Sequence, residues 1–67
     1  MAIVYDKLLR ILESRNITSY ILIRKDKVIG AATFEKIKKG GHIDTRSLDA
    51  LCRYLHCQPG DLIEYRD

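Results

Sequence analysis

The sequence predicts an all-α fold of five short helices around one core, with short β-prone segments at the two termini. Apolar residues recur at the three- and four-residue spacing of buried helix faces, and residues that favour turns separate the helical stretches. The apolar share of 46%, combined with charges of both signs, is ordinary for a folded chain. Because 67 residues enclose only a small core, we expect a single domain over residues 1–67.

The first predicted helix follows a β-prone run at residues 2–5 and extends from residue 5 to residue 14 or 15. Asn16 is expected to end it, because asparagine tolerates the left-handed conformation found after many helices. Three leucines have the spacing of a buried stripe on this helix: Leu8, Leu9 and Leu12.

The second and third helices are expected at residues 19–25 and 31–38, joined by a tight, cationic turn. Thr18 can cap the second helix, because its hydroxyl can accept a hydrogen bond from an unpaired amide. Gly40 and Gly41 can end the third helix, since glycine adopts positive φ without steric cost. In the third helix, Phe34 and Ile37 share the inward face, and the outward face consists of Ala32, Glu35, Lys36 and Lys39.

The fourth helix has the clearest pattern in the chain. Asp44 or Thr45 caps it, and apolar residues follow at i, i+3, i+4 and i+7. A last short turn of helix begins at Pro59, since proline suits the first helical position, and an extended tail follows at residues 64–67. The apolar residues of the fourth helix are Leu48, Leu51, Cys52 and Leu55.

All of the net charge of +3 lies on the second and third helices. Residues 24–39 contain six basic and two acidic residues, a balance of +4, and the rest of the chain sums to −1. A concentrated basic patch is typical of a surface that binds phosphates. A lysine cluster on its own is more often a solvated helix face. Here it coincides with a helix-turn-helix pattern, which favours nucleic acid as the partner.

The cysteines and histidines do not have the spacing of a metal site. The order His42, Cys52, His56, Cys57 contains no Cys-x-x-Cys pair, so we expect neither a metal nor a cofactor. Two cysteines do not make a disulfide framework, and we expect reduced thiols. The sequence has no visible Ser-His-Asp, Cys-His or paired-carboxylate arrangement, which argues against an enzyme.

The sequence also gives no sign of a membrane or secreted protein. No apolar run approaches the roughly 20 residues of a membrane span. The first residues reach a charge at Asp6, too early for a signal peptide. We therefore expect a cytoplasmic, nucleoid-associated protein without a small-molecule effector domain.

Three segments carry a family resemblance that covers nearly the whole chain. They are Ile-Thr-Ser-Tyr at residues 17–20, Ile-Gly-Ala-Ala-Thr-Phe-Glu-Lys-Ile-Lys-Lys-Gly at residues 29–40, and Thr-x-x-Leu-x-x-Leu-Cys-x-x-Leu-x-Cys-x-Pro-x-Asp-Leu at residues 45–62. In this order they resemble the Cro/repressor-like helix-turn-helix family, also called the xenobiotic-response-element family, in its minimal single-domain bacterial form. The resemblance implies a lambda-repressor-like fold and a sequence-specific, DNA-binding transcriptional regulator, with repression the expected action.

The resemblance also implies roles for particular residues. The helix at residues 31–38 would be the recognition helix in the major groove, with Lys36 able to donate to guanine. Alternatively, Ala31 and Ala32 are only good helix formers, and Lys36 contacts phosphate or solvent. For Tyr20 we expect a half-buried ring with its hydroxyl toward a phosphate. The implied DNA-contacting set is Ser19, Tyr20, Ala31, Ala32, Thr33, Glu35, Lys36, Lys38, Lys39 and His42.

Departures from the family pattern concentrate in the turn between the second and third helices. Val28 stands where the family usually has glycine, and one extra residue, Asp26 or Lys27, is inserted there. In addition, Gly30 replaces the usual Ser or Thr cap. Because of these departures, the sequence does not determine the angle between the two helices.

Family members usually act as two-fold dimers on half-sites about one helical turn apart. The terminal segments 3–5 and 63–66 are short and β-prone, and we expect them to pair, either within one chain or across a homodimer. An alternative from another class is a protein-interaction adaptor or antitoxin-like module that keeps the fold without reading DNA. The two alanines of the third helix are compatible with that alternative.

Overall fold

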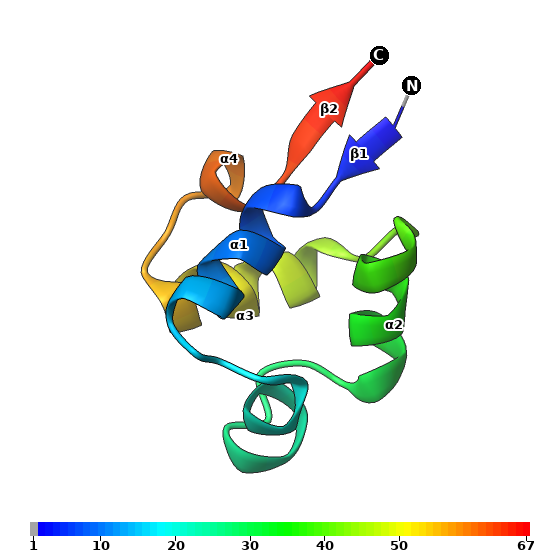
Figure 1. Cartoon of the computed structure of the whole chain (residues 1–67). Coiled ribbons are helices and arrows are strands. Elements are labelled where there is room, and N and C mark those ends of the chain that lie inside the picture. Colours follow the sequence, from blue (N-terminus) through cyan, green and yellow to red (C-terminus); the bar gives the residue numbers. More distant parts are fainter. Residues whose placement is uncertain (1) are drawn as a thin grey trace.

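The computed structural model describes residues 2–67 and confirms the all-α class with short terminal strands (Figure 1). Within these residues five helical segments pack together, and the two strands project side by side from one end of the molecule. The elements are β1 (Ala2–Val4), α1 (Asp6–Ser14), η1 (Ile21–Lys25), α2 (Ala31–Lys39), α3 (Thr45–Leu55), α4 (Pro59–Leu62) and β2 (Glu64–Arg66).

Every helix contributes to one hydrophobic core. The apolar residues of one predicted stripe differ in their degree of burial. In α3, Leu51 and Leu55 are buried, whereas Leu48 and Cys52 are half-buried at the edge of the core. No polar or charged residue among residues 2–67 is buried, so apolar contacts dominate the core. The buried residues are Tyr5, Leu8, Leu12, Leu22, Ile29, Ile37, Leu51, Leu55 and Leu62.

Local capping signals act as the sequence predicts. The Asp44 carboxylate accepts a hydrogen bond of 2.9 Å from the Ser47 amide and caps α3. Asn16, two residues after the end of α1, has φ 56°, and Gly40 has φ 75° at the end of α2. Of the two glycines after α2, Gly40 alone takes a positive φ. These helix ends are therefore set by residues within one turn of them.

The two terminal segments pair within the chain. β1 and β2 form an antiparallel two-stranded sheet, which is one of the two pairings that the sequence left open. The tail at residues 64–67 is therefore mostly a strand and not a free extension. The partners are Ala2 with Arg66, Ile3 with Tyr65, and Val4 with Glu64.

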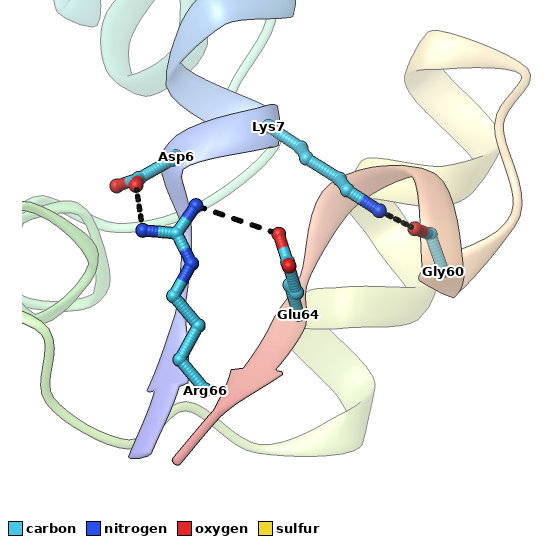
Figure 2. Close-up of polar contacts among 5 residues, drawn as sticks. All are labelled: Asp6, Lys7, Gly60, Glu64 and Arg66. Atoms are coloured by element: carbon cyan, nitrogen blue, oxygen red, sulfur yellow. Dashed lines mark hydrogen bonds and ion pairs between the residues drawn. The ribbon is translucent and has the colours of Figure 1, made fainter. Parts of the chain in front are cut away.

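Polar contacts attach this sheet to the helices (Figure 2). The Arg66 guanidinium lies 3.0 Å from the Asp6 carboxylate at the start of α1 and 3.6 Å from the Glu64 carboxylate. Nearby, the Lys7 ammonium donates to the Gly60 carbonyl of α4 at 3.1 Å. The N-terminal turn of α1 is thus connected to both C-terminal elements.

The second helix has the predicted bounds but a different pitch. Residues 19 and 20 form an α-helical turn, and Ile21–Lys25 continue as a π-helix. The Asp26 amide donates to the Ile21 carbonyl at 2.8 Å, which closes a turn one residue longer than an α-helical turn. The expected helix is therefore present, with a wider turn over its last five residues. A π-turn spans one residue more than an α-turn, which is the size of the insertion that the sequence indicated.

The turn that follows has one residue in the left-handed conformation. Lys27, and not Val28, has the left-handed conformation, with φ 51°. Val28 is half-buried, and its amide donates to the Leu22 carbonyl at 2.7 Å. Ile29 is then buried in the core before Gly30 precedes α2. A lysine therefore adopts the backbone conformation that favours glycine, one residue before the position where glycine was expected.

Candidate nucleic-acid interface

The outward face of α2 combines small residues at its start with cations toward its end. On the opposite face Ile37 is 2% exposed and Phe34 is half-buried, so the predicted division of the helix is correct. Thr33 lies between the two faces and is half-buried. The exposed residues of α2 are Ala31, Ala32, Glu35, Lys36, Lys38 and Lys39.

The three lysines of this face are not equivalent. Lys38 lies 3.8 Å from the Glu35 carboxylate, and its ammonium sits 5.7 Å from the centre of the Phe34 ring. Within residues 2–67, no ion pair involves Lys36 or Lys39. These two cations are therefore available to an external anion, whereas Lys38 already has partners on its own helix.

The remaining predicted contact residues lie outside α2. Ser19 and Tyr20 are exposed in the turn before η1. Tyr20 is 64% exposed, so the expectation of a half-buried ring was wrong, and Leu22 is the buried residue of this helix. His42 is exposed in the loop after α2 and borders a small cavity of about 190 Å³ beside β1.

The comparisons with known proteins agree on the kind of domain. The model of the Cro/C1-type helix-turn-helix DNA-binding domain matches residues 7–67. The chain belongs to this family. A crystal structure of the transcriptional regulator VanUg superposes with a TM-score of 0.82, is 33% identical, and covers 94% of this chain and 83% of that chain. No match was found among the curated proteins. No helix within residues 2–67 is long and apolar enough to cross a membrane.

A tyrosine–aspartate hydrogen bond joins η1 of this Cro/C1-type domain to α3. The Tyr54 hydroxyl, near the end of α3, donates to the Asp26 carboxylate at 2.5 Å, directly after η1. This hydrogen bond raises the pKa of the Tyr54 hydroxyl, since the phenol is the donor, and desolvation adds to the effect. Sequence reasoning missed this pair, because residues 28 positions apart carry no local signal.

Two further polar contacts fix the ends of the helix-turn-helix segment. The Tyr5 hydroxyl donates to the Gly41 carbonyl at 2.6 Å, which attaches the loop after α2 to the start of α1. The Arg15 guanidinium donates to the Leu55 carbonyl at 2.9 Å, which joins the end of α1 to the end of α3. A buried tyrosine ring that keeps its hydroxyl at a polar partner is a common way to anchor a loop. The first contact therefore holds the loop after α2 near the start of α1, and the second holds α1 and α3 together.

Proposed function

We propose that this protein is a sequence-specific transcriptional repressor that places α2 in the DNA major groove. The supporting observation is the exposed face of α2 in a Cro/C1-type DNA-binding domain, where Lys36 and Lys39 make no ion pair with any of residues 2–67. An α-helix with its side chains is about 10–12 Å across, so α2 fits a major groove about 12 Å wide. The structural neighbour VanUg is itself a transcriptional regulator.

Within this proposal, few residues of α2 read bases. Lys36 would donate to guanine O6 and N7, Glu35 would accept from a cytosine amine, and the alanines would contact thymine methyl groups. Affinity would then come mainly from phosphates and fall steeply with salt. The residues that we assign to the sugar-phosphate backbone are Ser19, Tyr20, Thr33, Lys38, Lys39 and His42.

We further propose that residues 1–67 act as one DNA-binding domain and bind DNA as a homodimer in the cytoplasm, beside the nucleoid. β1 and β2 already pair within the chain, but each strand of a two-stranded sheet retains a second edge that can pair with another copy. Light scattering coupled to size exclusion tests the dimer, with deletion of residues 64–67 as the variant. A strict monomer at high concentration, unchanged by the deletion, would contradict this assembly.

Fluorescence anisotropy tests DNA reading directly. The protein is titrated into a DNA fragment from upstream of its own gene and into a scrambled fragment, each across a salt series. We expect tighter binding to the upstream fragment, and loss of binding for Lys36→Glu. Arg53→Glu makes the same change of charge at an exposed position on α3 and serves as the matched control, with binding retained.

The salt dependence separates phosphate contacts from base contacts. If Lys39 binds a phosphate, Lys39→Gln should reduce the slope of log K against log salt by about 0.9 and weaken binding to both DNA fragments equally. If Lys36 reads a base, Lys36→Gln should weaken the upstream fragment more than the scrambled one. Absence of binding at low salt would reject the proposal in favour of the protein-interaction module.

A further inference from the structure

The C-terminal end of α3 brings the two cysteines of the chain together. His56 adopts φ 57°, and the Cys57 amide donates to the Cys52 carbonyl at 3.0 Å. This is the six-to-one hydrogen bond of a Schellman-type helix end, in which the side chains of the first and sixth residues commonly meet. Backbone bond lengths and this hydrogen bond together limit the Cα–Cα separation of the two cysteines to about 7 Å. A Cα–Cα separation below about 7 Å is required before two cysteines can be bridged through their sulfur atoms, and both cysteines also line the same groove.

Both cysteines are accessible from solvent along one groove. They are half-buried free thiols that line an open groove of about 830 Å³ between the outer side of α3 and the start of α4. Neither belongs to the fully buried core, and neither is among the residues assigned to DNA. The groove also contains the apolar side chains of Leu48 and Pro59, and the charged side chains of Asp49 and Arg53.

The surroundings of the pair restrict its chemistry. Burial raises the pKa of the Cys52 thiol, and the negative charge of Asp49 adds to the effect, so this thiol stays protonated at neutral pH. Peroxide chemistry at Cys52, which needs a thiolate, is therefore disfavoured. Within residues 2–67 no group of three or more metal-binding side chains is present, which does not suit the four ligands of zinc. A centre that bonds to two sulfur atoms fits best.

We propose that Cys52 and Cys57 form a dithiol site that binds a soft, thiophilic atom through two bonds to sulfur. The chemical class of ligand is the monosubstituted trivalent arsenicals. In the reaction two As–S bonds form, and the oxygen of the arsine oxide leaves as one water with the two thiol protons. No atom changes oxidation state, and no oxidant is required. The site is independent of the proposed DNA-reading function.

Intact-mass spectrometry with phenylarsine oxide tests the site. The protein is loaded with the arsenical, challenged with excess glutathione, and then with dithiothreitol. We expect one adduct per wild-type chain that survives the monothiol and is removed by the dithiol, because a chelated arsenic must break two bonds. Cys52→Ser and Cys57→Ser should each lose the adduct to glutathione.

A variant with a displaced thiol controls for the number of cysteines. Cys57→Ser combined with Tyr65→Cys keeps two thiols but moves the second to β2, which projects from the molecule away from the end of α3 (Figure 1). It should lose the adduct to glutathione. Removal of the wild-type adduct by glutathione, two adducts per wild-type chain, or equal retention by the displaced variant would each overturn the proposal. If Cys52→Ser fails to fold, wild type and the displaced variant decide the question. If Cys57→Ser fails to fold, wild type and Cys52→Ser decide it.

Discussion

We expect the substitution Lys27→Gly to stabilise the protein. The φ of 51° at Lys27 places a Cβ-bearing residue in the left-handed region, between η1 and α2. For an L-residue other than glycine this conformation costs roughly 1–2 kcal/mol. Lys27→Gly removes that cost, because glycine has no Cβ and adopts positive φ freely.

The size of the gain follows from two opposing terms. Relief of about 1–2 kcal/mol in the folded state is offset by about 0.4–1 kcal/mol from the greater freedom of glycine in the unfolded chain. We expect a net gain of about 1 kcal/mol, which in a domain of this size raises the melting temperature by about 4–8 °C. Lys27 is exposed, so little packing is lost with its side chain.

Urea and thermal unfolding followed by circular dichroism measure the effect. Lys27→Ala is the matched control, since it removes the charge but keeps a Cβ at the same φ, and it should change stability by less than about 0.5 kcal/mol. Lys25→Gly, inside η1, should instead destabilise by about 1 kcal/mol. If Lys27→Gly is no more stable than Lys27→Ala, the strain assigned to this turn is not present.

The remaining predictions concern the core, the cap of α3 and its contact with η1. Leu51→Ala should cost about 2–5 kcal/mol in urea unfolding, because Leu51 is 0% exposed and the truncation leaves a cavity; a loss below 1 kcal/mol would mean that the core repacks. Hydrogen bonds from the Ser47 side chain and then from the Ser47 amide lower the pKa of Asp44 below its ordinary value, so the cap stabilises the fold at higher pH and is lost as pH falls through the lowered pKa. Asp44→Asn, which keeps the cap, should reduce the dependence of the urea midpoint on pH in the acid range. If that pH dependence is unchanged, it arises from other carboxylates. Tyr54→Phe should speed amide hydrogen exchange around Asp26 while distant amides keep their protection, and uniform acceleration would instead mean global destabilisation.

The candidate DNA site was predictable from sequence as a surface, but not as a set of contacts. Apolar spacing places Ile37 inside and Lys36 and Lys39 outside, because residues three or four apart share a helix face. The same pattern does not show that Lys38 pairs with Glu35 and lies over Phe34. The side-chain conformations of these residues depend on neighbours that a helical wheel does not include. The contacts of the lysines with DNA remain predictions.

The sequence by itself determined the order of the helices, most of their bounds and their caps. Asn16, Gly40 and Asp44 act through hydrogen bonds and φ preferences that reach only a few residues along the chain, so local reading finds them. The leucine stripes likewise determined most of the core, since burial follows helical periodicity.

The tertiary structure alone decided the pitch of the second helix and the long-range polar contacts. An α-turn and a π-turn differ by one residue, and the choice depends on placing both Leu22 and Ile29 in a core built by other helices. The Tyr54–Asp26 hydrogen bond joins residues that only packing brings together. The spacing of apolar residues indicates which face of a helix is buried, but not which residues of another helix it contacts. Those helix–helix contacts determine the geometry of the helix-turn-helix.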